Sequence, residues 1–281
     1  MVKEIFLTIK TNHQLTNHQS PLLMHGIIHL SAIPVRREPS DKSEMVTQLL
    51  FGDAIRVIEQ KENWHHIITA WDHYEGWIDR KQYLPVSKTT FDNLDKNPAP
   101  VSSELFQLIT DQKTGDSFPI VMGSSLPFYS SGECRIEDRI FSFDGSAKPF
   151  EMETNRDSIV ETAMMFQNTP YLWGGRTPLG IDCSGFTQLV FKANGFRMKR
   201  DAYQQAEMGD PYSFVEEAQP GDLAFFDNEE GRIVHVGILI GDSKIIHASG
   251  CVRIDPFDHY GIFSPERGGY THNLRVIKNI L

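Results

Sequence analysis

The sequence predicts an α+β protein in which two small all-β units precede a mixed C-terminal domain. Short β-prone runs separated by turn signals fill the first half of the chain, and from about residue 150 apolar residues recur at helical spacing before two apolar strands. At 281 residues the chain also exceeds what one small core usually organises. The expected divisions are an N-terminal arm over 1–24, β units over 25–87 and 88–150, and the C-terminal domain over 151–281.

The amino-acid composition indicates which binding partners and which cellular compartment to expect. The formal net charge of −10 disfavours nucleic acid and anionic membranes, which reward clustered Lys and Arg. Three scattered cysteines are too few for a disulfide framework, and near the N-terminus only the short run IFLTI is apolar. We therefore expect a cytoplasmic protein, unless an export leader has been removed, and a monomer that binds neither nucleic acid nor membrane.

The first β unit has the pattern of a small barrel. Its β-prone runs are punctuated by an Arg-x-x-Pro turn (Arg36 to Pro39), a Leu-x-x-Gly step (Leu49 to Gly52) and a closing Gly-Trp-Ile (Gly76 to Ile78). This order resembles bacterial Src-homology-3-like modules. The stretch from Ile120 to Glu133 echoes the first unit, so residues 88–150 are interpreted as a second, divergent Src-homology-3-like barrel.

Cys183 is the candidate nucleophile because it follows a Gly/Pro-rich loop and precedes a helical pattern, Phe186, Leu189, Val190 and Ala193. At a helix N-terminus, free backbone N–H groups and the helix dipole favour thiolate over thiol. The same N–H groups can bind an oxyanion. On position alone, an isolated cysteine is more often a small buried core residue.

His235 and His247 lie on two apolar runs joined by a turn around Gly241 to Ser243, which predicts a β-hairpin. An odd loop length would place both rings on one face, whereas a two-residue loop would separate them. On a shared face the second histidine can orient the first and fix its tautomer. Structural histidines or a zinc site are the alternatives, although the spacing matches no standard zinc pair and no fourth ligand is evident.

Five ordered motifs then carry a family resemblance: Y-x-W-G-G from Tyr171, D-C-S-G-F around Cys183, P-G-D-L-x-F-F, H-V-G-I from His235 and H-A-S from His247. Together they resemble NlpC-type cell-wall cysteine peptidases. The resemblance implies a papain-like α+β core without a metal or cofactor that hydrolyses murein peptides. It also implies that Cys183 attacks, His235 is the base and His247 orients it, with Tyr171, Trp173 and Ser184 beside the substrate.

The arrangement of β units ahead of such a domain resembles, more narrowly, γ-D-glutamyl-L-diamino acid endopeptidases of the dipeptidyl-peptidase VI type. These act through a thioester on murein peptides with a free N-terminal L-alanine. A buried ammonium needs carboxylates, and the resemblance implies Asp182 for that task, with Glu44 and Tyr74 supplied by the first β unit. Arg200 and Asp201 match a substrate loop, Arg200 facing the D-glutamate carboxylate. Exposed loop positions are the alternative for Glu44 and Tyr74.

Two other functions stay open at this point. The thiol chemistry can serve a peptidase or amidase, or an acyl transferase, acting on intact cell-wall peptidoglycan. Alternatively, the β units can be wall-binding adaptors attached to an inert C-terminal scaffold. Cys134 and Cys251 lack a helix-start context and a neighbouring base, so we expect them to be structural.

Overall fold

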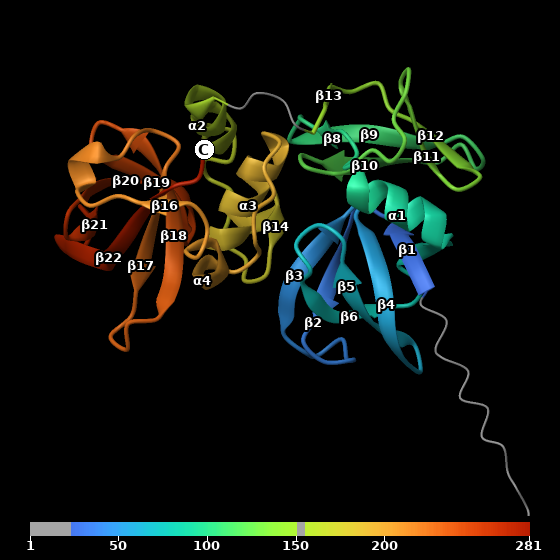
Figure 1. The fold of residues 1–281 in the computed structure, drawn as a ribbon, viewed down its shortest axis with the longest axis horizontal. Helices are drawn as coiled ribbons and strands as arrows, with labels where there is room; N and C mark the ends of the chain where they lie inside the picture. Colours follow the sequence, from blue (N-terminus) through green and yellow to red (C-terminus); the bar gives the residue numbers. More distant parts are fainter. Residues whose placement is uncertain (1–23, 151–154) are drawn as a thin grey trace, which may run out of the picture.

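A computed structural model describes residues 24–150 and 155–281, which form three units in chain order (Figure 1). The predicted N-terminal arm lies outside the described residues except for Met24, which begins strand β1 (Met24–Ile28). The predicted boundary at 150/151 adjoins residues 151–154, which are also outside them, so these divisions stay predictions. Within the described ranges, no helix has both the length and the apolar character needed to cross a membrane.

The first unit is one antiparallel sheet with the strand order β3-β2-β6-β5-β4-β1-β7. In β5 every second side chain is buried, as the two-residue period of a strand requires. Ile33, Val35 and Ile67 belong to the core that these side chains form. The remaining strands are β2 (Ala32–Arg36), β3 (Met45–Leu50), β4 (Ala54–Lys61), β5 (Trp64–Thr69), β6 (Glu75–Asp79) and β7 (Tyr83–Val86).

The second unit opens with a helix that the sequence analysis did not predict, α1 (Lys88–Lys96), where the Ser87 side chain caps the first turn. A four-stranded sheet, β10-β9-β12-β11, and a two-stranded ribbon of β13 and β8 follow. The predicted second barrel is therefore not confirmed in detail. Its strands are β8 (Val101–Ser102), β9 (Phe106–Asp111), β10 (Ser117–Val121), β11 (Glu133–Ile136), β12 (Arg139–Ser142) and β13 (Ala147–Lys148).

The two β units share a core, because Ile27 and Phe51 of the first unit pack in the same cluster as Phe141 and Phe143 of the second. Cys134 is fully buried in this cluster. Burial raises the pKa of its thiol to about 12, so the thiol is neutral and fits the structural role predicted for it.

The C-terminal unit packs helices against one face of a seven-stranded sheet with the order β16-β22-β17-β18-β19-β20-β21. Strand β21, at one end, also pairs with β22, the second strand from the other end, so the sheet closes into a barrel. Its helices are α2 (Arg156–Met164), α3 (Cys183–Ala193), α4 (Ala202–Gln205) and the 3-10 turn η1 (Val215–Glu217). Its strands are β14 (Arg176–Thr177), β15 (Gly180–Ile181), β16 (Asp210–Pro211), β17 (Leu223–Asp227), β18 (Ile233–Gly241), β19 (Lys244–Ser249), β20 (Cys251–Asp258), β21 (Gly261–Ser264) and β22 (Gly269–Asn279).

Helix α3 lies between the C-terminal sheet and the two β units (Figure 1). Every one of its residues is buried. On the side of the β units, Gly123 comes so close to Leu189 that an added Cβ would lie 2.4 Å from its side chain. The helix that begins at the candidate nucleophile is thus held by all three units.

The β18–β19 hairpin corrects one step of the sequence analysis. Its loop has two residues between paired Gly241 and Lys244, the length expected to separate the histidines. A β-bulge between Leu239 and Gly241 inserts one extra residue and shifts the register. Gly237 consequently lies opposite His247, which places His235, two residues earlier, on the same face as His247.

A buried ionic cluster, here called the junction, joins the three units. Lys192 of α3 is fully buried, and its Nζ lies 2.7 Å from Asp53 Oδ1 of the first unit and 3.2 Å from Ser125 Oγ of the second. Arg176 adds a second cation, 3.6 Å from Asp53 Oδ2. Burial alone would raise the pKa of Asp53, but Lys192 and Arg176 outweigh it and hold the pKa below its ordinary value.

We expect Asp53→Asn to destabilise the protein strongly, because it leaves two buried cations without their counter-charge. Removing one partner of a buried pair costs about 3–5 kcal/mol of unfolding free energy. Urea denaturation measures the loss. The matched control is Asp92→Asn, since Asp92 pairs with Lys88 on the surface and its loss should leave the denaturation midpoint nearly unchanged. Equal midpoints for Asp53→Asn and wild type would contradict the role of the junction.

Candidate active site

Cys183 occupies the first turn of α3 and lines a cavity of about 440 Å³. Asp182 is the N-cap of this helix, and its Oδ1 accepts a hydrogen bond of 2.6 Å from the backbone N–H of Gly185. The cap fixes where the helix begins and therefore where the sulfur lies. The backbone N–H of Val236, next to His235, also donates to the sulfur. The predicted helix-start position of the nucleophile is confirmed.

The thiol of Cys183 is not poised as a thiolate in the free protein. Burial raises its pKa to about 12, and the negative charge of Asp182 adds to the rise. Backbone N–H groups and Arg200 act in the opposite direction but do not outweigh burial. The helix start does favour thiolate, since the backbone N–H of Ser184 lowers the pKa, but desolvation is the larger effect in the resting site.

His235 and His247 form a directly bonded pair on the face of the C-terminal sheet that also carries Phe226, whose ring lies beside that of His235. Nε2 of His235 lies 2.8 Å from Nδ1 of His247, with the rings nearly perpendicular. The pairing leaves Nδ1 of His235 as the ring nitrogen that can accept the thiol proton. Burial lowers the pKa of His235 well below its ordinary value, with further lowering from His247 and His272. The imidazole is consequently neutral, as a general base requires.

The opposite wall of the cavity comes partly from the first β unit, as predicted for Glu44 and Tyr74. The Tyr74 hydroxyl donates to Asp201 at 3.2 Å. Nε1 of Trp173 donates to Glu44 Oε1 at 2.7 Å, and Arg37 pairs with the other oxygen of Glu44 at 2.9 Å. The exposed-loop alternative for Glu44 and Tyr74 does not hold, because both side chains line the cavity that contains the sulfur.

Comparison with known proteins places this geometry in a family. Residues 168–265 match the model of the NlpC/P60 family, and residues 35–82 match that of the bacterial dipeptidyl-peptidase Sh3 domain. The C-terminal unit is an NlpC/P60 domain. It makes the protein a cysteine peptidase, a hydrolase of peptides related to peptidoglycan.

Several known proteins match most of the chain. A γ-D-glutamyl-L-lysine dipeptidyl-peptidase of Bacillus subtilis is 29% identical over 72% of this chain and 71% of its own length. Dipeptidyl-peptidase 6 of Lysinibacillus sphaericus is 27% identical over 80% of this chain and 88% of its own. The crystal structure of an NlpC/P60 family protein from Bacillus cereus has the same fold, with a TM-score of 0.77 over 92% of this chain and 99% of that one, at 22% identity.

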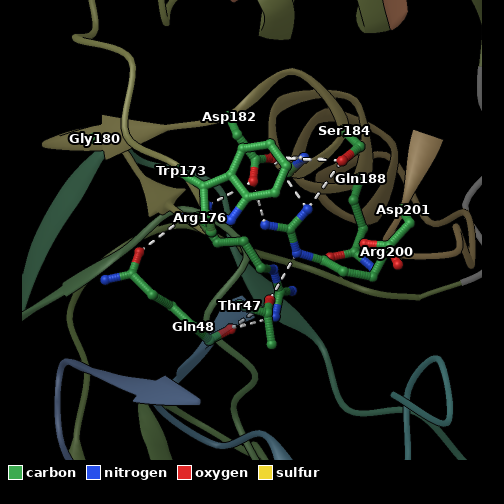
Figure 2. Close-up of polar contacts among 12 residues, drawn as sticks. Thr47, Gln48, Trp173, Arg176, Gly180, Asp182, Ser184, Gln188, Arg200 and Asp201 are labelled. Atoms are coloured by element: carbon green, nitrogen blue, oxygen red, sulfur yellow. Dashed lines mark hydrogen bonds and ion pairs between the residues drawn. The ribbon is translucent and has the colours of Figure 1, made fainter. Parts of the chain in front are cut away.

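Asp182 and Arg200 both line the cavity, but the NlpC/P60 domain pairs them with each other, which disfavours the substrate contacts predicted for them (Figure 2). Arg200 is buried and donates to both oxygens of Asp182, at 3.0 and 2.6 Å. Asp182 also accepts from the backbone of Gly174 and Gly185, so four donors occupy its lone-pair sites. No acceptor site remains on Asp182 for a substrate ammonium.

Four of the five N–H groups of Arg200 donate within the protein. Its Nε donates to Thr47 of the first β unit at 2.7 Å, and Nη1 donates to Ser184 at 3.0 Å (Figure 2). A bidentate contact with the D-glutamate carboxylate would need two free parallel N–H groups, which Arg200 does not offer. Ser184 lines the cavity with its hydroxyl held by Arg200.

Gly174 explains the double glycine of the Y-x-W-G-G motif. It has φ +74°, and a Cβ there would lie 2.3 Å from the backbone oxygen of Met45 in β3. Tyr171 begins the same loop. Its pKa is raised by burial first and then by the nearby acidic groups of Cys183 and Asp182, so its hydroxyl is neutral.

Sequence reasoning missed two residues beside the histidines. Asp255 of β20 accepts from His247 Nε2 at 3.0 Å, and His272 of β22 stacks on His235 with ring centroids 4.2 Å apart. The position of Asp255 beside His247 could have been predicted from the strand pattern. Gly250 makes a tight turn between β19 and β20, and the pairing of His247 with Arg253 puts Asp255 on the same face as His247. His272 had no such signal, since β22 is distant in sequence.

Three histidines come close enough to suggest a metal site. Ligand nitrogens of His235, His247 and His272 lie within 4.8 Å of one another. Both ring nitrogens of His247 are already hydrogen-bonded, one to His235 and one to Asp255. A cation held by all three rings would have to break this chain, so the arrangement fits proton transfer better than zinc binding.

We expect alkylation of Cys183 by iodoacetamide to speed up continuously from about pH 6 to about pH 9, because the raised pKa keeps the thiolate a minor species that grows with pH. Peptide mapping by mass spectrometry separates Cys183 from Cys134 and Cys251, and Cys183→Ala supplies the blank. A rate that is already at its plateau near neutral pH would instead indicate a resting thiolate and contradict the assignment.

Proposed function

We propose that the protein hydrolyses the γ-D-glutamyl-L-diamino acid bond of murein peptides whose N-terminal L-alanine is free. The observation that carries this proposal is the state of Asp201. It lines the cavity beside Cys183 and is half-buried, yet within residues 24–150 and 155–281 no Lys or Arg is ion-paired with it. A desolvated carboxylate of this kind is stabilised by an incoming cation.

The electrostatics of Asp201 support an ammonium ligand. Burial raises the pKa of its carboxyl, with Asp182 and Asp72 adding to the rise, while Arg200 and Tyr74 oppose it. Glu44 is less available, because Arg37 and Trp173 already occupy its oxygens. We therefore assign Asp201 as the partner of the substrate amine, with Glu44 holding the Trp173 ring in place.

The names of two relatives described above support the bond that is cleaved. The first is named a γ-D-glutamyl-L-lysine dipeptidyl-peptidase, and the second is named dipeptidyl-peptidase 6. Release of a dipeptide requires that the N-terminus of the substrate lie two residues before the bond that the nucleophile attacks. An amine site on the wall of the same cavity as Cys183 fits that requirement.

The proposed reaction proceeds through a thioester. As Cys183 Sγ attacks the γ-carbonyl carbon, its proton passes to Nδ1 of His235, and backbone N–H groups at the start of α3 stabilise the oxyanion. Collapse of the tetrahedral intermediate breaks the C–N bond, and His235 returns the proton to the leaving amine. A water molecule, deprotonated by His235, then hydrolyses the thioester, which releases L-Ala-D-Glu and restores the thiol.

The neutral thiol and imidazole suit this sequence of steps. Both groups are uncharged before the substrate arrives, so the dry site holds no ion pair that must be stabilised in the resting state. Charge develops only during attack, next to the helix N-terminus.

We also propose a cytoplasmic setting, where a reducing environment keeps the nucleophile reduced. Cell fractionation tests the location, and size-exclusion chromatography with light scattering tests the expected monomer.

We expect L-Ala-γ-D-Glu-L-Lys to be cleaved to L-Ala-D-Glu and lysine, and its N-acetylated form to be cleaved at least about 100-fold more slowly. Acetylation removes the charge that Asp201 is proposed to bind. Mass spectrometry of the products measures both rates, with Cys183→Ala as the inactive control. Equal cleavage of the two peptides, or cleavage only of intact peptidoglycan, would refute the proposal.

We expect Asp201→Asn to raise KM for the free-amine peptide by about 30-fold or more, with a smaller effect on kcat. In the wild type, KM should rise as pH falls through the raised pKa of Asp201, since ammonium binding needs the ionised carboxylate. Steady-state kinetics across acidic pH measure both effects. Glu207→Gln, which removes an exposed carboxylate from the same segment, should leave KM unchanged. An unaltered KM in Asp201→Asn would exclude this amine site.

A further inference from the structure

Two histidines in series leave the direction of their shared hydrogen bond undecided. Nε2 of His235 and Nδ1 of His247 are 2.8 Å apart, and either nitrogen can carry the hydrogen. If His247 donates, neutral His235 carries its hydrogen on Nδ1 and cannot accept a proton from Cys183 there. If His235 donates, its Nδ1 is bare and basic. The ability of the pair to act as a base therefore depends on which tautomer is present.

Asp255 removes this ambiguity. Its Oδ2 lies 3.0 Å from Nε2 of His247, and an ionised carboxylate can only accept hydrogen bonds. Nε2 of His247 must then carry the hydrogen, so in the neutral ring Nδ1 is bare. That bare nitrogen accepts from Nε2 of His235, which leaves Nδ1 of His235 free for the thiol. One carboxylate thus orders both rings.

The surroundings of Asp255 keep it ionised and fixed. It is 5% exposed. Nη2 of Arg253 donates to its Oδ1 at 2.9 Å, and the guanidinium is ion-paired with it. Burial raises the pKa of Asp255, but the hydrogen bonds from His247 and Arg253 outweigh it and the net pKa is lowered. Glu266, the other acid near this group, binds the far side of Arg253 at 3.4 Å.

His272 restrains the ring of His235, at the opposite end of the hydrogen-bonded row from Asp255. His272 lies on strand β22, and its ring stacks on that of His235 at an interplanar angle of 26°. Its own pKa is lowered to about 4, chiefly by burial and then by His247, so it adds no positive charge near neutral pH. The rings of His235 and His247 are therefore held between an anion on β20 and a neutral ring on β22.

We propose, resting on the hydrolysis proposed above, that Asp255 is a positioning residue that sets the tautomers of His247 and His235 and so makes His235 Nδ1 the base for Cys183. Asp255 does not line the cavity, and it acts through His247. His247 thereby does more than hold the catalytic ring in place, because it transmits the direction of the hydrogen bond.

The decisive measurement is the tautomer of each ring in the full-length protein without substrate. Long-range ¹H–¹⁵N NMR at about pH 8 distinguishes Nδ1–H from Nε2–H, and His235→Gln and His247→Gln spectra assign the signals. We expect both rings to be Nε2–H tautomers. A hydrogen on Nδ1 of His247, whether in the other neutral tautomer or in an imidazolium, would overturn the proposal.

Kinetics of Asp255→Asn give the second test. We expect kcat to fall at least about 100-fold with KM nearly unchanged, and the ring signals to show Nδ1–H forms. Asp258→Asn is the matched control, because Asp258 lies on the same strand but accepts from Tyr270 instead of a histidine, and it should keep both kcat and tautomers. An unchanged kcat in Asp255→Asn would overturn the proposal.

The two tests separate this proposal from the proposed substrate. The NMR result needs no substrate, so it can support or refute the ordering of the rings even if murein tripeptides are not cleaved. If Asp255→Asn fails to fold, the wild-type spectrum still decides. Conversely, cleavage of the tripeptide by a wild type with the opposite tautomers would refute the role of Asp255 alone.

Discussion

The carboxylate of Asp182 holds the nucleophile, the loop before it and the first β unit in one arrangement. It caps α3, accepts the backbone N–H of Gly174 and receives two hydrogen bonds from Arg200, which in turn reaches Thr47. Each of these contacts is buried, where hydrogen bonds to an ion are strong and the loss of a partner is costly. The position of Cys183 relative to the cavity wall follows from this single group.

The chemistry of the site follows from the same burial. An exposed cysteine beside a histidine would exchange its proton freely with water, but here burial makes both charged forms unfavourable in the resting enzyme. The protein then depends on fixed donors and acceptors, supplied by backbone N–H groups on the side of α3 and by the ordered rings on the side of the sheet. Preorganised groups of this kind need no rearrangement when charge appears during the reaction.

The positions of the candidate catalytic residues could be predicted from the sequence because each follows from a local pattern. Cys183 precedes a helical repeat, and His235 and His247 lie on two adjacent apolar runs. The shared face of the histidines depended on a bulge near Ile240, which no residue pattern announces. The five-motif resemblance supplied the roles, and the family match supports the domain to which they belong.

The predictions from sequence were least accurate for charged residues, whose roles depend on the charged groups that they contact. Asp182 and Arg200 were both recognised as charged residues near the nucleophile, and the sequence could not tell that they neutralise each other. Asp255 was overlooked because its partner is on the neighbouring strand. The helix α1 was missed as well, since its segment is polar on average and buries only Phe91. For the charged residues, the missing information was a contact between separate elements.

The junction has a consequence for how such proteins can be recombined. Lys192 belongs to the peptidase domain, Asp53 to the first β unit and Ser125 to the second, so the charge balance of the interior is divided among three segments. A peptidase domain grafted onto foreign β units would carry an ammonium group into an apolar interface with nothing to neutralise it. Lineages that exchange these modules are therefore constrained to inherit the acid and the lysine together, or to replace both with apolar side chains at once.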